Sequence, residues 1–275
     1  MKVLIVGLLP FDSGKTSVAL SLIGEAIQRG FDVGVVKPVT AFSGWYHYQS
    51  VRRSMEFGKL IGEDVYKLHN RAKNGDPIEI KSPVVLMHMP PDPERVDWQS
   101  YFFTALNLSE QIVALRLTTP NETRHYYAPA NLERLTRVLR DVAIELICSL
   151  NPKPMEIENF DRILLKVGKF ADECVRYISS EHELTIIESF NNASAPTESS
   201  ADSDVVLLVA PSKVAIYSGE RYKKAVDVLL KPPWLISSEE IASLLRPIKT
   251  VETKPTIDIS GDWAEGLLDE VLKVL

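Results

Sequence analysis

The stretch that decides the fold is KVLIVGLLPFDSGKTSVALSLI, residues 2–23. It begins with the apolar run Val3–Val6, breaks into a turn, and then places Gly14-Lys15-Thr16 at the start of a helical pattern. A strand, a tight turn and a helix in this order form a cradle for phosphate, because glycine lets the backbone approach the anion and the first N–H groups of the helix point at it. The stretch therefore predicts the first βα unit of an α/β fold with a nucleotide-phosphate site.

The loop supplies all residues of the predicted nucleotide-binding site: Asp12, Ser13, Gly14, Lys15, Thr16 and Ser17. The Lys15 ammonium is suited to β/γ-phosphate oxygens, and the Thr16 hydroxyl is suited to Mg²⁺. The strict phosphate-loop pattern needs a glycine five positions before Gly14, but Leu9 stands there and the nearest glycine is Gly7. An ordinary strand–turn–helix is the alternative interpretation.

Hydrophobic periodicity extends the α/β pattern along the chain. After a helix that ends near Gly30, the valine-rich segment 32–39 is predicted as a second, buried parallel strand. The pattern predicts a doubly wound, mostly parallel sheet. Further strands are expected at 78–89, 111–118, 184–188 and 205–210, a loop at 211–217, and helices at 50–70, 131–150, 161–179, 218–230, 237–245 and 263–275.

Composition excludes several classes of protein. The chain has 275 residues, of which 45% are hydrophobic and 25% charged, which is ordinary for a globular protein with a large core. A net charge of −6 argues against a nucleic-acid partner. No uncharged apolar run is long enough to predict a membrane span, and Met1-Lys2 runs straight into a strand without a signal peptide. Two cysteines are too few for a disulfide framework, so a cytoplasmic protein is expected.

Two charged residues outside the loop follow predicted strands. Lys37 stands at the carboxyl end of the second strand, where ligands of open α/β sheets bind, and Thr40 and Ser43 supply hydroxyls nearby. Glu188 ends the strand LTIIE, and a carboxylate there suits Mg²⁺ beside phosphate. The alternative for Lys37 is a solvated strand-end lysine, and the alternative for Glu188 is an N-cap or a loop salt bridge.

Together these motifs resemble the dethiobiotin synthetase-like P-loop proteins, which include dethiobiotin synthetase and the ATP domains of cobyrinic and cobyric acid amidating enzymes. The similarity lies in the loop Asp12–Thr16, the segment KPVTAFSG at 37–44, the strand ending in Glu188, and the strand 205–210. The chain is most similar to a divergent, archaeal-type predicted P-loop ATPase/GTPase. The resemblance implies one P-loop NTPase-like domain, residues 1–275, with a long α+β insertion at about 90–155.

The resemblance also implies roles for individual residues. ATP and Mg²⁺ would be the cofactors, with Lys15 on the nucleotide phosphates and Lys37 facing an acceptor substrate, both as catalytic residues. Thr16, Asp64 and Glu188 would hold Mg²⁺, and Thr40 and Ser43 would lie on the substrate side. A homodimer is expected by resemblance alone.

The chain departs from the family after Glu188, where the family's glycine-rich turn is replaced by Ser-Phe-Asn-Asn-Ala. The expected function is therefore ATP-dependent activation of a small carboxylate or carbamate by phosphoryl transfer, with an acceptor side unlike that of dethiobiotin synthetase. The alternative is a nucleotide-dependent regulatory or scaffold ATPase without a small-molecule acceptor. The choice between ATP and GTP stays open, and a chain that has lost nucleotide binding is a third possibility.

Overall fold

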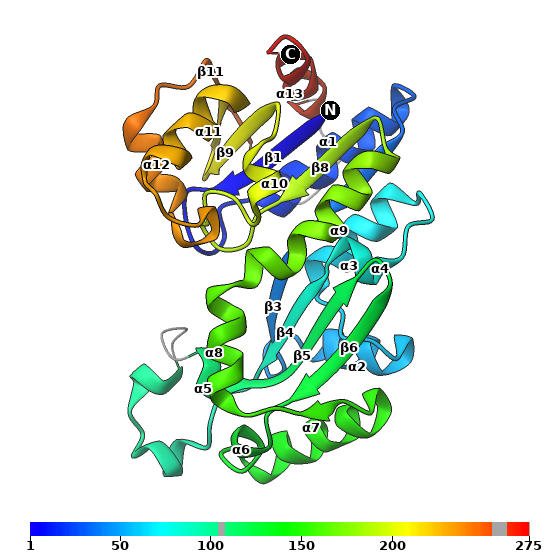
Figure 1. Ribbon diagram of the computed structural model, residues 1–275, viewed down its shortest axis with the longest axis vertical. Coiled ribbons are helices and arrows are strands. Elements are labelled where there is room, and N and C mark those ends of the chain that lie inside the picture. Colours follow the sequence, from blue (N-terminus) through cyan, green and yellow to red (C-terminus); the bar gives the residue numbers. More distant parts are fainter. Residues whose placement is uncertain (104–107, 255–262, 275) are drawn as a thin grey trace.

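The computed structural model describes residues 1–103, 108–254 and 263–274. Strands in these ranges form two sheets, one of six strands and one of five. In Figure 1 the six-stranded sheet occupies the upper half of the view and the five-stranded sheet the lower half. Helices lie beside both sheets, so the fold is α/β. Within the described ranges, none of the helices has both the length and the apolar character needed to cross a membrane.

The six-stranded sheet is parallel at its centre and antiparallel at one edge. Its strands are β1 (Lys2–Gly7), β2 (Val33–Val36), β8 (Leu184–Glu188), β9 (Val205–Ala210), β10 (Lys213–Ser218) and β11 (Lys249–Glu252), in the order β11-β10-β9-β1-β8-β2. β8 pairs in parallel with β1 and β2, β9 pairs in parallel with β1, and β10 pairs antiparallel with β9 and β11. The expectation of a loop at 211–217 is therefore wrong, because Ser212, with φ 65°, closes a tight hairpin into β10.

Alternation along the strands buries apolar side chains on both faces of this sheet. In β1, Val3 and Ile5 belong to one core, and Leu4 and Val6 belong to the other. The helices that cover the first core are α1 (Lys15–Gln28), α3 (Glu63–Ala72) and α13 (Trp263–Leu272). Those that cover the second are α9 (Val167–Glu181), α10 (Glu198–Ala201), α11 (Gly219–Val228) and α12 (Ser238–Leu244).

The single strand expected at 32–39 is two strands in two different sheets. β2 ends at Val36 in the first sheet, and the next strand begins at Val39 in the second. Lys37 and Pro38 lie between them. Proline has no N–H to donate to a ladder, so the pairing of β2 ends before it.

The second sheet has the order β3-β4-β5-β6-β7, with strands β3 (Val39–Ser43), β4 (Val84–His88), β5 (Ile112–Thr119), β6 (Glu122–Tyr127) and β7 (Lys153–Pro154). β3 is parallel to β4 and β6 to β7, whereas the pairs β4–β5 and β5–β6 are antiparallel. This sheet draws on residues 39–154, a wider span than the insertion expected at about 90–155. Both sheets are therefore mixed.

Helices also cover the second sheet. One face packs on α2 (Tyr48–Phe57) and α7 (Arg137–Leu150), and the other packs on α8 (Ile157–Leu165) and the first part of α9. The remaining short elements are α4 (Ile78–Lys81), α5 (Leu108–Gln111), α6 (Pro129–Leu132), η1 (Pro93–Val96), η2 (Ser100–Phe103) and η4 (Pro233–Leu235).

α9 belongs to the cores of both sheets. Val167 and Ala171 pack in the core of the second sheet, whereas Cys174, Val175 and Ile178 pack in a core of the first. Figure 1 shows this helix running from the lower part of the molecule to the upper part. The relative position of the two sheets therefore depends on α9.

Several segments predicted as single elements are interrupted. The segment 50–70 forms α2 and α3, because Gly58, with φ 63°, ends α2. The segment 131–150 contains the end of α6 and all of α7, and 161–179 contains parts of α8 and α9, which meet at Lys166. The segment 78–89 contains the helical turn α4 before β4. The terminal helix expected at 263–275 is α13, and residue 275 lies outside the described residues.

Candidate functional site

A cavity of about 910 Å³ opens where the two sheets meet. Its lining combines the loop 10–17, the end of β8 and one face of β3 and β4. Clefts of this size hold small-molecule ligands and cofactors. The predicted nucleotide loop and the strand that follows Lys37 thus line one cavity.

The loop before α1 has the backbone conformation that its glycine permits. Gly14 has φ 91° and is the N-cap of α1, and Asp12 also has a positive φ, 54°. A left-handed φ at Gly14 is favourable only for a residue without a Cβ. Lys15 is 8% exposed, and its Nζ donates to Ser13 Oγ at 3.2 Å and to the backbone oxygen of Asn191 at 2.7 Å.

Gly7 has no Cβ, so other side chains can approach its backbone closely, which the side chain of Leu9 would not allow at position 9. A Cβ at Gly7 would lie 2.4 Å from Ser13 Oγ and 2.6 Å from Lys15 Nζ. Only glycine therefore lets the Lys15 side chain fold back over the end of β1. The sequence shows Gly7 as the nearest glycine to the expected position, but its contact with Lys15 is visible only in three dimensions.

A second group of charges lies beside the loop. Lys37 Nζ contacts Glu188 Oε1 and lies 2.8 Å from Asp64 Oδ2, and Thr16 Oγ1 donates to Glu188 Oε1 at 2.9 Å. Lys37 is 5% exposed and Glu188 is 1% exposed, so Lys37 is not a solvated strand-end lysine. The structure thus brings together four residues predicted from distant parts of the sequence.

The charges explain the pKa shifts in this cluster. Burial lowers the pKa of Lys37, but the carboxylates of Glu188 and Asp64 outweigh it and raise that pKa above its ordinary value. Burial raises the pKa of Glu188, and although burial also opposes ionisation of Asp64, the Lys37 ammonium holds the pKa of Asp64 below its ordinary value. Burial, together with the Lys37 charge, lowers the pKa of Lys15.

One carboxylate oxygen of Glu188 is available to a ligand. Its Oε2 is buried and has no hydrogen-bond partner, although Oε1 accepts from Thr16 and Lys37. An orphaned carboxylate oxygen beside a threonine hydroxyl and Asp64 fits Mg²⁺, which takes one or two protein carboxylates and completes its shell with phosphate and water. The part of the chain that the structure describes holds no larger group of His, Cys, Asp or Glu side chains suited to a metal.

The two hydroxyls predicted on the substrate side point to opposite faces of β3. Ser43 lines the cavity, where its Oγ accepts from the N–H groups of Trp45 and Tyr46 at 3.3 Å each. Thr40 is 2% exposed and lies on the other face, where its Oγ1 is 2.8 Å from Ser82 Oγ. The structure therefore brings Ser43, and not Thr40, to the site.

Sequence reasoning did not assign a role to several cavity residues. His88 and His47 line the far end, and Phe190, Trp234 and Leu235 form part of the wall. The sequence provides no reason to select His47 or His88, because the histidines do not have the spacing of metal ligands. The wall residues follow β8 or belong to η4, far from β3 in sequence, so only the tertiary fold places them opposite that strand.

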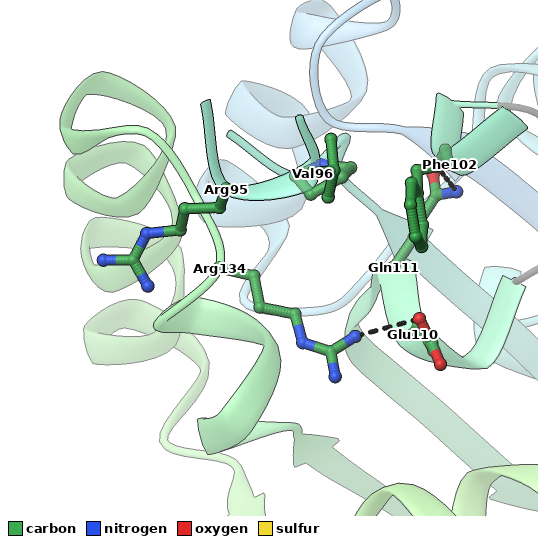
Figure 2. Close-up of a pocket in the computed structure, with 7 residues that line it drawn as sticks. Arg95, Val96, Phe102, Glu110, Gln111 and Arg134 are labelled. Carbon is green, nitrogen blue, oxygen red and sulfur yellow. Dashed lines mark hydrogen bonds and ion pairs between the residues drawn. The ribbon is translucent and has the colours of Figure 1, made fainter. Parts of the chain in front are cut away.

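A second cavity of about 260 Å³ lies nearby, lined by Pro91, Arg95, Val96, Phe102, Glu110, Gln111 and Arg134. Figure 2 shows Arg134 directed at Glu110, with their closest charged atoms 3.1 Å apart, whereas the Arg95 side chain extends away from this pair. In this cavity Glu110 is the partner of Arg134, and the described residues that line it include none of those predicted for the nucleotide site.

Comparison with protein-family models, with curated proteins and with solved structures finds no match to this chain. The resemblance to the dethiobiotin synthetase-like proteins therefore stays a prediction from sequence motifs. The function has to be inferred from the geometry of the site.

Proposed function

We propose that this chain is a Mg²⁺-dependent, ATP-binding P-loop protein of the dethiobiotin synthetase-like type, which activates a small carboxylate or carbamate by phosphoryl transfer. The observation that carries the proposal is the meeting of Lys15, Lys37 and Glu188 at one end of a cavity that continues beyond them. The two unpaired cysteines agree with a reducing, cytoplasmic setting, and the family resemblance extends the proposal to a homodimer.

The loop and its lysine would hold the nucleotide. Backbone N–H groups at the start of α1 and the Lys15 ammonium would bind the β- and γ-phosphates. Thr16, Asp64 and Glu188 would hold Mg²⁺, which when bound neutralises phosphate charge. Lys15 would exchange its bond to the Asn191 carbonyl for phosphate oxygens.

The proposed reaction needs no general base. An acceptor that is already anionic attacks the γ-phosphorus, a new P–O bond forms to the acceptor oxygen, and the bond to the β–γ bridging oxygen breaks to leave ADP. With Asp64 and Glu188 holding Mg²⁺, the Lys37 ammonium, which contacts both carboxylates, would be free to hold the acceptor anion and the transferring group together.

The test separates the roles of the two lysines by calorimetry with Mg·ATP and Mg·GTP, and by ADP release with a panel of carboxylates. We expect Lys15→Ala to weaken Mg·ATP binding by about 100-fold or more. Lys37→Ala should change Mg·ATP affinity only a few-fold and abolish carboxylate-dependent ADP release. Lys67→Ala, on the exposed part of α3, serves as the control. Equal loss of nucleotide binding in both variants would refute the division of roles between Lys15 and Lys37. A wild-type chain that binds neither nucleotide would refute the proposed function.

One observation favours the regulatory ATPase as a second candidate. The glycine-free turn after Glu188 contacts the loop directly, because the Asn191 carbonyl accepts from Lys15 at 2.7 Å. Nucleotide binding would break this bond and release the turn. Nucleotide hydrolysis that no carboxylate stimulates, together with nucleotide-dependent dimerisation in light scattering, would support this candidate over the first.

A further inference from the structure

The cavity continues past Lys37 along one face of the second sheet. β3 and β4 are parallel, and their register pairs Ala41 with Leu86 and Ser43 with His88. Because side chains two apart on a strand share a face, Val39, Ala41 and Ser43 follow one another away from Lys37. All three line the cavity, as do Leu86 and His88.

The middle of this path is apolar. Val39 and Leu86 are buried, whereas Ala41 is the exposed residue of β3, so the path lies open above its small side chain. The facing wall is also apolar and comes from other elements of the fold: Leu164, Val167, Phe190 and Trp234. A ligand in this part of the cavity would be in contact with hydrocarbon on both sides.

The far end of the path is polar. Ser43, His47 and His88 meet there, and the Ser43 N–H donates to His47 Nδ1 at 3.2 Å. A ring nitrogen that accepts a hydrogen bond carries no proton, so the proton of a neutral His47 ring is on Nε2. Hydroxyl and imidazole groups can both donate to and accept from a ligand.

This end provides no fixed positive charge. The lysines that line the described part of the cavity are Lys15 and Lys37, and both lie at the opposite end. Burial, reinforced by the neighbouring His47, lowers the pKa of His88 to about 4, so His88 is neutral at pH 7. A carboxylate at this end would be partly desolvated without a countercharge, which is costly.

We propose that the acceptor is an elongated amphipathic molecule whose anionic end lies at Lys37, whose apolar middle lies along Val39 and Ala41, and whose far end is an uncharged hydrogen-bonding group, such as an amide or hydroxyl, held by Ser43 and His88. The position of the anionic end rests on the proposed function. The position and chemistry of the other two parts rest on the cavity lining. Val39 and Ala41 are two residues apart on β3, so the apolar part spans about 7 Å.

The test uses three straight-chain acids of similar length: octanedioic acid monoamide, octanedioate and nonanoate. Their affinities are measured by calorimetry, with and without Mg·ADP. We expect the monoamide to bind at least about tenfold more tightly than the other two, because octanedioate brings an unpaired charge and nonanoate leaves the polar groups unpaired.

Three variants locate the binding. His88→Leu should bring the monoamide and nonanoate to within a few-fold of each other, and His88→Asn should restore part of the difference. Ala41→Phe should block all three acids by filling the middle of the path. Val228→Phe, which adds the same ring at an exposed position of α11, is the matched control. Mg·ATP affinity is measured for each variant as a check that it folds.

The outcomes separate this inference from the proposed function. Octanedioate binding as tightly as the monoamide, acid binding that Ala41→Phe leaves intact, or no binding of any of the three acids would overturn the inference, even if Mg·ATP binds. Acid preferences as expected in a chain that fails to bind Mg·ATP or Mg·GTP would overturn the proposed function and leave the assignment of the path standing.

Discussion

Gly7 has no Cβ, and this absence determines how the Lys15 side chain lies at the loop end of the cavity. The position would hold a Cβ only if the ends of the Ser13 and Lys15 side chains moved. Both are flexible side-chain ends, so a methyl group there would displace the lysine more than it would disturb the core. Gly7 is thus a positioning residue that acts through Lys15.

We expect Gly7→Ala to weaken Mg·ATP binding about tenfold, with a small change in melting temperature, as measured by calorimetry and thermal denaturation. We expect a factor of about ten in affinity, and not a complete loss, because the backbone of the loop is retained. Gly266→Ala, where a Cβ would meet open space in α13, is the matched control and should leave nucleotide affinity unchanged. Wild-type affinity in Gly7→Ala would show that Lys15 does not need its observed position.

Arg116 is a buried cation with a structural role. It is 0% exposed, and its guanidinium donates to the backbone oxygens of Leu60, Glu79 and Ser82 at 2.9, 3.1 and 2.8 Å. Burial lowers its pKa to about 10, which still leaves it charged at neutral pH. One side chain on β5 thus satisfies the carbonyls of segments that flank α3 and α4.

We predict that Arg116→Met lowers the free energy of unfolding by about 3 kcal/mol or more, because three buried carbonyls lose their donors. Urea denaturation would measure the change. Arg124→Met on the neighbouring strand β6, where the charge pairs with an exposed Glu122, should change the free energy of unfolding very little, because water screens this pair. Similar losses in the two variants would contradict the structural role of Arg116.

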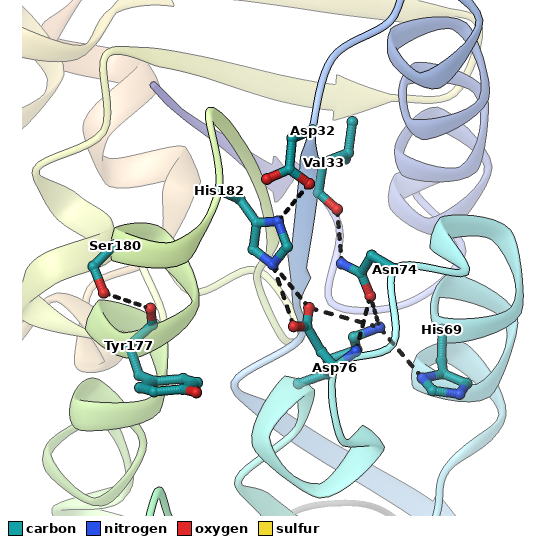
Figure 3. Close-up of polar contacts among 9 residues, drawn as sticks. Asp32, Val33, His69, Asn74, Asp76, Tyr177, Ser180 and His182 are labelled. Atoms are coloured by element: carbon teal, nitrogen blue, oxygen red, sulfur yellow. Dashed lines mark hydrogen bonds and ion pairs between the residues drawn. The ribbon is translucent and has the colours of Figure 1, made fainter.

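At the scale of elements, the carboxyl end of α9 is joined to two other segments by His182. Figure 3 shows its ring between Asp32, just before β2, and Asp76, just before α4. The ring nitrogens lie 2.8 Å from Asp32 Oδ1 and 3.1 Å from Asp76 Oδ2. Asn74 adds a bond from its Nδ2 to Val33 O at 2.8 Å.

This contact predicts a pH dependence of stability. Burial lowers the pKa of His182, but its bonds to Asp32 and Asp76 outweigh burial and raise the pKa above the ordinary value. The folded state therefore holds the proton more tightly than the unfolded state. The stabilisation is complete below the unfolded pKa of about 6.5 and is lost as the pH rises through the raised folded value.

The measurement is urea denaturation of the wild type and His182→Asn between pH 5 and pH 9. The difference in unfolding free energy between the two should shrink as the pH rises above about 6.5. Lys81, whose pKa is lowered to about 8 mainly by burial, acts in the opposite direction above pH 8 and shares Asp76 with His182, so the difference is read below pH 8. A difference that is constant with pH would show that His182 is not charged in the folded chain.

At the scale of the whole molecule, two sheets share one helix and one cavity. The chain passes from one sheet to the other through Lys37 and Pro38, and α9 contributes to a core of each. Unfolding of either sheet would remove the apolar surface against which part of α9 packs. We therefore expect the two sheets to unfold together.

Urea denaturation should therefore show one transition with the same midpoint by circular dichroism and by fluorescence. Mg·ATP at about 100 times its dissociation constant should raise the unfolding free energy by about 2.7 kcal/mol. At the same concentration Lys15→Ala, whose affinity is expected to be about 100-fold weaker or more, should gain about 0.4 kcal/mol or less. Two separate transitions, of which Mg·ATP shifts only one, would show that the sheets are energetically independent.

The sequence by itself determined the local part of this protein. β1, the loop 10–17 and α1 are contiguous, so the apolar run, the glycine and the helical period suffice to predict their conformation. Lys37 and Glu188 could be placed at strand ends for the same reason. Helix interruptions were missed because apolar periodicity continues across a break when both pieces face a core.

Only the tertiary structure decided what these residues meet. Pairing between strands distant in the chain depends on which surfaces bury one another, and local periodicity carries no information about partners. For that reason the contact of Lys37 with Asp64 and Glu188, the split of 32–39 into two sheets, and the approach of Trp234 to β3 could not be read from the chain. The proposed nucleotide end comes from one continuous segment, whereas the proposed acceptor end forms only where the two sheets and α9 pack together.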